Sequence, residues 1–478
     1  MASLACRWLW DGRACKPRRG VSLNIRDGRI ASVEPGDGRY FVMPAFVDAH
    51  CHLTQMARFA GAVDLSGARC ADDVLIAVAE AAGNGSGPIR GERFDDSLWE
   101  DSRLPSPEEL DAAGGGRPVF LRRVCCHMAL MSTSMMDLYG DDTDGIDRDR
   151  GVAAEAPVLE YDRRFPPSDG EIDSALRDVE AYVHACGVTG LCSMERLADS
   201  RRLQCAGLDL ELAFAVLAED LDGVGPEDDL LGVKCFLDGS VGAGTAAMSR
   251  EYVSGGGRDR LLYEDEELTD LLVRGWRLGL PPVMHAIGGR AVEQAARCSA
   301  EACVRTGPPE ELRWARVEHA EELADALDRL DPELHCVCGQ PNFVANWQTE
   351  EGLYGSRLGW PAARRMNPFA STLAAGLRLG FGSDCMPFGP LAGLSGAVAH
   401  PAPRQRLSVD GALRAYTSAA ADLSGFAGLA EPVGPGRRAD LVALSNNPFE
   451  SGGFDGVEVV ATLRRGRLVA GSERGLWN

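Results

Sequence analysis

Side chains able to bind a metal ion stand at the ends of several short apolar segments. The first segment, "AFVDAHCHL", closes on His50 and His52, which face the same side of a β-strand while Cys51 faces the other. Later segments carry an amine, two imidazoles and a carboxylate at similar places: Lys234, His285, His319 and Asp384. Imidazoles with a carboxylate suit zinc or another borderline divalent metal. Four of the 8 histidines fall at such ends, so we predict a metal centre, although each residue alone would indicate little.

Eight apolar segments of this kind recur along the middle of the chain: "AFVDAHCHL", "GVTGLCSME", "LELAFAVLAED", "LGVKCFLDGS", "PPVMHAIGG", "LRWARVEHAEE", "LHCVCGQPN" and "LRLGFGSDCMP". Helix-like stretches such as "DEELTDLLVRGWRLG" separate most of them. Eight strands with crossover helices predict an α/β fold, a (β/α)8 TIM barrel over residues 44–427. Functional groups gather at the C-terminal strand ends of such a barrel, which is where the six residues fall.

Two further parts are expected around the barrel. Residues 1–43 and 428–478 alternate apolar and polar positions between turn signals such as "RDGR", so we predict one small composite β-sandwich built from both ends of the chain. The stretch after the first barrel strand is too long for a strand-to-helix connection. We therefore predict an insertion subdomain at residues 62–150, within the barrel.

Charge and composition exclude some classes of protein. A net charge of −22 argues against nucleic acid and against anionic membranes as partners. The N-terminus has no apolar core of a signal peptide, and no segment approaches the ~18 apolar residues of a membrane span. The 15 cysteines are therefore expected to be reduced thiols in a cytoplasmic protein. A zinc site at "HCVC" is disfavoured, because His335 and Cys336 would face opposite sides of a strand.

The opening "VMPAFVDAHCHL" resembles that of the amidohydrolase superfamily. Further segments are similar, in family order, to its YtcJ-like branch (amidohydrolase family 3), which includes N-substituted formamide deformylases: "VKCFLDGSVGAGTA", "HAIGGRAVE", "RVEHAEEL", "GQPNF", "GSDCMPFGPL" and "GRRADLVALSNNPFE". The resemblance covers nearly the whole chain. It implies a metal-dependent hydrolase that acts on a C–N bond other than a peptide bond in a small-molecule substrate, with a homodimer as the usual assembly.

The resemblance also implies a binuclear centre. His50 and His52, with Asp384, would hold the more buried metal, and His285 and His319 the more exposed one. Lys234, carboxylated by CO2, would bridge the two together with a hydroxide. Two zinc ions are expected, and iron or manganese would also fit. Asp384 would act as general base and then as general acid.

The composition draws attention to the bridging lysine. Among 49 basic residues only Lys16 and Lys234 are lysine. A buried amine loses its proton easily and can then add CO2, which an arginine cannot do. A lysine that reaches solvent or pairs with an acid remains the alternative explanation for this position.

Four more residues are candidate contacts of lower weight. His127, in "RVCCHMALMS", matches an insertion histidine of the family and would reach the substrate or serve the fold. Asp238 follows the lysine strand and would orient the pocket or a metal ligand. Gln340 and Asn342, in "GQPNF", would contact the substrate from the seventh strand.

The chain departs from the family pattern at one acid and one base. Gly289 stands where the family usually has an acid, and Ala243 and Gly244 stand where it often has Ser-Arg. Both changes suggest a less polar and roomier pocket. Ester or cyclic-amide hydrolysis on the same centre, and an inactive binding protein on this fold, are the alternative functions.

Overall fold

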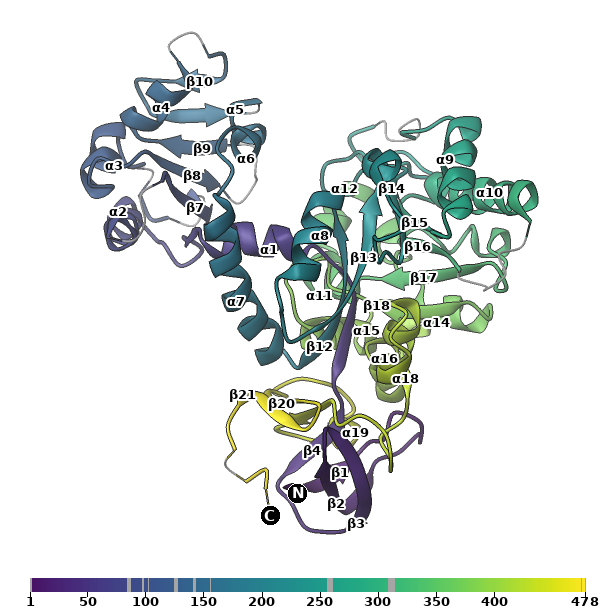
Figure 1. Cartoon of the computed structure of the whole chain (residues 1–478). Helices are drawn as coiled ribbons and strands as arrows, with labels where there is room; N and C mark the ends of the chain where they lie inside the picture. The colour runs from purple at the N-terminus through teal and green to yellow at the C-terminus, as the bar shows by residue number, and fades with distance from the viewer. Residues whose placement is uncertain are drawn as a thin grey trace. The chain divides into compact units, whose positions relative to one another are not determined.

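The computed structural model describes residues 2–83, 87–96, 99–101, 103–123, 128–140, 143–154, 156–255, 261–307, 314–473 and 475–477. Its central element is a parallel sheet whose eight strands neighbour one another in chain order (Figure 1). The strands are β5 (Phe46–Cys51), β12 (Val188–Glu195), β13 (Glu211–Leu217), β14 (Gly232–Phe236), β15 (Pro282–Ala286), β16 (Ala315–His319), β17 (His335–Gly339) and β18 (Arg378–Phe381). All eight coincide with the apolar segments predicted as strands.

The two outer strands of this sheet approach each other, so the sheet is a nearly closed TIM-type barrel, as predicted. The backbone N–H of Asp384, just after β18, donates to the carbonyl of His50 in β5 at 2.7 Å. A Cβ on Gly382 would lie 2.3 Å from the backbone nitrogen of His50, so only glycine allows this approach. The seam of the barrel therefore joins two elements that carry predicted metal ligands.

Helices follow most barrel strands and bury one face. In α9 (Asp265–Arg277), Leu268, Leu272 and Trp276 are buried at helical spacing, while acidic residues occupy the first turn and arginines the last, as the helix dipole favours. The others are α8 (Leu197–Cys205), α10 (Gly289–Thr306), α11 (Pro341–Trp347), α12 (Leu353–Leu358), α13 (Trp360–Ala363), α14 (Phe369–Ala374), α15 (Pro390–Val398), α16 (Val409–Ala415), α17 (Ser418–Leu423) and α18 (Ala427–Ala430).

The two ends of the chain share one seven-stranded mixed sheet, in the order β21-β20-β19-β4-β1-β2-β3. Its strands are β1 (Ala2–Leu9), β2 (Arg18–Arg26), β3 (Arg29–Pro35), β4 (Tyr40–Pro44), β19 (Leu441–Leu444), β20 (Val459–Arg464) and β21 (Arg467–Gly471), with α19 (Pro448–Ser451) between β19 and β20. Pairing of β4 with β19 joins the N-terminal and C-terminal strands. The sandwich form of this part, and the predicted domain limits, stay predictions.

Residues 54–179 form a compact unit of their own, and the predicted insertion at 62–150 lies within these limits. A six-stranded sheet runs in the order β10-β11-β9-β8-β7-β6. The strands are β6 (Val63–Asp64), β7 (Ile89–Phe94), β8 (Val119–Arg123), β9 (Met128–Met131), β10 (Ile146–Asp147) and β11 (Val152–Ala154). The helices that lie wholly or mostly here are α1 (Leu53–Ala60), α2 (Ala71–Ala82), α3 (Pro107–Ala113), α4 (Thr133–Tyr139), α5 (Ala156–Leu159), α6 (Tyr161–Arg164) and α7 (Asp169–Ala185).

Among the described residues, no helix has both the length and the apolar character needed to cross a membrane.

Candidate metal centre

The predicted imidazoles and carboxylate meet at the C-terminal ends of β5, β15, β16 and β18. The ring centroids of His50 and His52 lie 5.5 Å apart, those of His50 and His319 5.1 Å, and those of His285 and His319 4.4 Å. The Oδ1 atom of Asp384 lies 3.0 Å from Nε2 of His52 and 3.5 Å from Nε2 of His50. These five residues, from four strands, therefore form one cluster of candidate ligand atoms.

His50, in β5, and His52, just after β5, have defined ring orientations. His50 donates through Nδ1 to the Glu318 carboxylate, and His52 donates through Nδ1 to the carbonyl of Met194 at 3.2 Å. Carboxylate and carbonyl oxygens only accept, so in each ring Nδ1 carries the proton. The Nε2 atoms, which face Asp384, are thereby left to accept a metal or a second proton. Burial would lower the pKa of His52, but the hydrogen bond and charge of Asp384 outweigh it and raise the pKa.

The two histidines of β15 and β16 differ in their ring contacts. His285 donates through Nε2 to the carbonyl of Gly239 at 2.9 Å, which leaves its Nδ1 with a lone pair. Nδ1 of His319 is buried and has no hydrogen-bond partner among the described residues. Burial, followed by the Lys234 charge, lowers the pKa of His285 to about 4, and burial, followed by the neighbouring His285 and His50, lowers the pKa of His319 well below its usual value. Both rings are thus neutral near pH 7, the form that binds metals.

The Lys234 side chain is buried at 1% exposure, and its Nζ has no hydrogen-bond partner among the described residues. Nζ lies 5.0 Å from the ring centre of Phe236, whose ring is 5.3 Å from that of His285. Burial is the main cause that lowers the pKa of this lysine. An orphaned buried ammonium is costly, so the site fits a neutral amine or its carbamate better than a cation.

Asp384 is held as a carboxylate. Burial would raise its pKa, but the neighbouring His50 and His52, with Lys234, bring it down to about 2. The donor set as a whole, four imidazoles, an ionised carboxylate and an orphaned amine, is therefore suited to divalent metal ions.

Backbone strain marks the two strand ends that deliver ligands. His319 and Ala320 have φ of 67° and 48°, and Asp384 and Cys385 have φ of 51° and 60°. Left-handed backbone costs a residue with a Cβ about 1 kcal/mol or more, and it is retained mainly at functional positions. Here it turns the chain sharply at the point where each ligand leaves its strand.

Asp48, which sequence reasoning missed, holds the barrel seam beneath the cluster. Its Oδ1 accepts from the backbone N–H of His50 and from that of Ser383, both at 3.0 Å. Asn342, a predicted substrate contact, uses its amide to donate to the carbonyls of Ser383 at 2.7 Å and Met386 at 2.8 Å. Both side chains therefore fix the loop that carries Asp384. The only signal for Asp48 is its place two residues before a ligand, on the same strand face.

Three predicted contacts remain: Asp238, Gln340 and His127. Asp238 accepts from the backbone N–H groups of Ala247, Ile287 and Gly288, at 2.8, 3.0 and 2.8 Å, and its Oδ1 is 3.6 Å from Nε2 of His285. It thus fixes the end of β15, as an orienting role requires. Gln340 is buried at 1% exposure and donates to the carbonyl of Cys338 at 3.3 Å. His127 lies outside the described residues.

The idea that Gly289 makes the pocket roomier and less polar is wrong at that position. A Cβ there would lie 2.2 Å from Oγ of Ser249 and 3.1 Å from Oε2 of Glu322. The same Glu322 oxygen accepts from the backbone N–H groups of Gly289 at 2.8 Å and Ser249 at 2.7 Å. A carboxylate from β16's loop therefore occupies the start of α10, and the missing family acid leaves no space behind.

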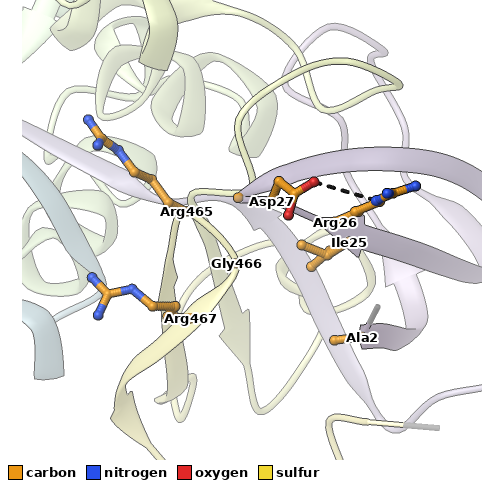
Figure 2. Close-up of a pocket in the computed structure, with 8 residues that line it drawn as sticks. Ala2, Ile25, Arg26, Asp27, Arg465, Gly466 and Arg467 are labelled. Atoms are coloured by element: carbon orange, nitrogen blue, oxygen red, sulfur yellow. Dashed lines mark ion pairs between the residues drawn. The ribbon is translucent and has the colours of Figure 1, made fainter.

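A surface hollow of about 600 Å³ lies away from this cluster, between the β2–β3 and β20–β21 turns (Figure 2). Arg26, Arg465 and Arg467 line it, and Arg26 pairs with Asp27 at 3.4 Å. It contains none of the predicted site residues.

Comparison with known proteins agrees with the barrel fold. The sequence profile of the Amidohydrolase family matches residues 37–470, so the chain belongs to this family of metal-dependent hydrolases, in its YtcJ-like branch. The chain is 24% identical to YtcJ of Bacillus subtilis (strain 168), over 90% of this chain and 88% of that protein. It is 26% identical to N-substituted formamide deformylase of Arthrobacter pascens, over 86% and 84%.

Solved structures show the same fold. An uncharacterized metal-dependent hydrolase from Pyrococcus furiosus superposes with a TM-score of 0.76 at 26% identity, over 94% of this chain and 99% of that one.

Proposed function

We propose that this protein hydrolyses an amide-type C–N bond, other than a peptide bond, in a small molecule. The observation that carries the proposal is the arrangement of His50, His52 and His285. Each ring donates through one nitrogen to a fixed acceptor, which prepares the other nitrogen as a ligand. Such preorganisation suits a metal-dependent hydrolase.

Six residues would hold two divalent cations: His50, His52, Lys234, His285, His319 and Asp384. Zinc is the expected metal, and iron or manganese would fit the same donors. Lys234 would serve as a carbamate after reaction with CO2, because its buried Nζ lacks any other described partner. When bound, the cations lower the pKa of water towards neutrality and polarise the substrate carbonyl.

Asp384 would move the proton. Its Oδ1 lies within 3.5 Å of Nε2 of His50 and of Nε2 of His52. Its lowered pKa keeps it an ionised carboxylate, which can accept a proton when water attacks the carbonyl. It would then deliver that proton to the leaving nitrogen. A C–O bond forms, the C–N bond breaks, and the products are a carboxylate and an amine.

Turnover of a defined panel by protein reconstituted with zinc, iron or manganese tests the proposal. The panel contains N-formyl and N-acyl amines, lactams and esters. We expect measurable kcat/KM on an acyclic amide, and Asp384→Asn should lower kcat by about 10²–10⁴-fold because it removes the base.

Two outcomes would contradict the proposal in different ways. Exclusive turnover of esters would replace the amide-type C–N bond with an ester bond, whereas exclusive turnover of lactams would keep the C–N bond and narrow the substrate to cyclic amides. No turnover of any compound by fully loaded protein would favour a binding protein on this fold.

A further inference from the structure

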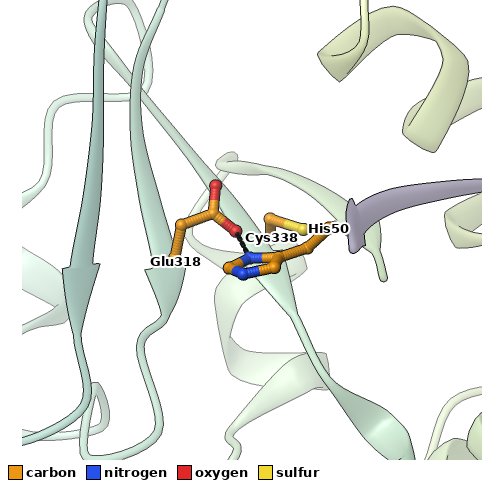
Figure 3. Close-up of side chains that lie close together, drawn as sticks. All are labelled: His50, Glu318 and Cys338. Atoms are coloured by element: carbon orange, nitrogen blue, oxygen red, sulfur yellow. Dashed lines mark hydrogen bonds and ion pairs between the residues drawn. The ribbon is translucent and has the colours of Figure 1, made fainter. Parts of the chain in front are cut away.

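A buried ion pair lies inside the barrel below the metal cluster. Glu318, at 0% exposure, receives hydrogen bonds from Nδ1 of His50 and from Nε of Arg316, one on each carboxylate oxygen. The Cys338 thiol lies against the same group, within 4.8 Å of both His50 and Glu318 ligand atoms (Figure 3). The family resemblance implies no role for Glu318, Arg316 or Cys338.

The arrangement around Glu318 disfavours a metal ion held by His50, Glu318 and Cys338. Arg316 is only 2% exposed, and its guanidinium already neutralises the carboxylate. A divalent cation beside it would add like charge in a low-dielectric interior. Nδ1 of His50 is also engaged as a donor to the carboxylate. The cluster is therefore a hydrogen-bonded unit and not a second metal site.

Arg316 ties this unit to the strand that carries His50. Its Nη2 donates to the carbonyl of Ala49, the residue just before His50, and its Nη1 donates to the carbonyl of Leu423 at 3.3 Å. One ion pair thus sets both the backbone position of β5 and the rotation of the His50 ring. A carboxylate behind a metal-binding histidine also makes the ring a better donor to the metal.

We infer that Glu318, held by Arg316, is the positioning residue of the more buried metal site: it fixes the His50 tautomer with Nε2 free and so sets metal affinity. The inference rests on the proposed function only in requiring that His50 binds a metal. It predicts that loss of the carboxylate lowers zinc affinity by about 10–100-fold, the range known for partners behind a ligating histidine.

Competition for zinc against a chromophoric chelator measures this effect in wild type, Glu318→Gln and a control, Asp440→Asn. Asp440 is a buried acid paired with Arg438 at 2.9 Å, outside the cluster. Zinc affinity should fall for Glu318→Gln and stay unchanged for Asp440→Asn. Equal affinity for wild type and Glu318→Gln would overturn the inference, whereas a wild type that binds neither zinc nor iron nor manganese would overturn the proposed function itself.

The double variant Arg316→Met, Glu318→Leu separates positioning from mere stability. Apolar residues of similar size can replace a buried ion pair without loss of stability. We expect the urea midpoint of the double variant to lie closer to that of wild type than the midpoint of Glu318→Gln does, while its zinc affinity stays low. Recovery of affinity together with stability would show that the pair is only structural.

A measurement on the wild type does not depend on any variant folding. With 15N-labelled histidine in the zinc-loaded protein, His50 should show a protonated Nδ1 and a metal-bound Nε2. A metal-bound Nδ1 would overturn the inference.

Discussion

Lys234 combines three properties that single it out at the residue scale. It is one of two lysines in the chain, its amine is buried, and no described hydrogen-bond partner reaches Nζ. An arginine in this place would keep its charge at any working pH, whereas a buried lysine can become neutral and react with CO2. The residue type thus follows from the chemistry proposed for the position.

Phe236 gives a prediction about substrate choice. The side chain is 39% exposed at the end of β14, and its ring lies 5.3 Å from His285. An exposed aromatic ring beside the cluster should pack against an apolar group of the substrate. Phe236→Ala should lower kcat/KM about 10-fold or more for amides with a large apolar group, as expected for a lost hydrophobic contact.

The control for Phe236→Ala is Phe236→Leu, which keeps an apolar side chain and should retain most of the activity on the same amides. Steady-state kinetics on a matched pair of amides, one with a bulky and one with a methyl substituent, provides the comparison. An equal loss on both amides would show that the ring does not contact the substituent.

At the scale of elements, the barrel seam is the part that positions the ligands. Asp48 accepts two backbone N–H groups, one from β5 and one from the loop after β18. Asp48→Ala leaves both donors buried and unpaired, and we expect the free energy of unfolding to fall by about 2–4 kcal/mol. Urea denaturation at pH 7.5 measures the change.

Asp11→Ala is a matched surface control for Asp48→Ala. Asp11 also accepts two backbone N–H groups, from Arg13 at 2.9 Å and Ala14 at 2.8 Å, but in an exposed loop. Its loss should cost about 0.5 kcal/mol or less, since water replaces the acceptor. Similar losses for the two variants would contradict the importance assigned to the seam.

The sequence was sufficient to predict the barrel strands and the candidate ligands at their ends. It was not sufficient to predict the residues that hydrogen-bond to those ligands. The eight barrel strands were predictable because each is a short apolar segment ending in a polar residue. The hydrogen-bond partners of the ligands were not predictable, because they depend on the register between strands. Glu318 reaches His50 only when β16 and β5 meet across the barrel interior. Asp48 and Cys338 likewise look like ordinary strand residues until the barrel forms.

At the scale of the whole molecule, buried histidines outside the cluster couple stability to pH. His335, in β17, accepts from the backbone N–H of Asp331 at 2.9 Å, and its Nε2 is 2.9 Å from Oγ of Ser299. Burial, despite the nearby Asp331, lowers the pKa of His335. As pH falls below the ordinary histidine pKa, about 6.5, the unfolded chain takes up a proton that the folded chain refuses, so stability falls.

His335→Asn should remove the part of this dependence that His335 contributes. The variant is expected to be less stable than wild type at pH 7.5, and the difference should shrink by up to about 1.4 kcal/mol by pH 5.5, one unit below the ordinary histidine pKa. Urea midpoints at pH 7.5, 6.5 and 5.5 provide the test. Ser299→Ala keeps the imidazole and should keep the wild-type pH dependence; a difference between wild type and His335→Asn that is constant with pH would refute the assignment.

The metal content of the purified protein, grown with ample metal and measured by inductively coupled plasma mass spectrometry, tests the central claim most directly. We predict close to two divalent ions per chain in wild type and a clear loss in Lys234→Ala. That variant should also lose activity, and acetate should restore part of it by replacing the bridging carboxylate. Wild type with well under one metal per chain, or a Lys234→Ala protein with unchanged metal content and activity, would contradict the account.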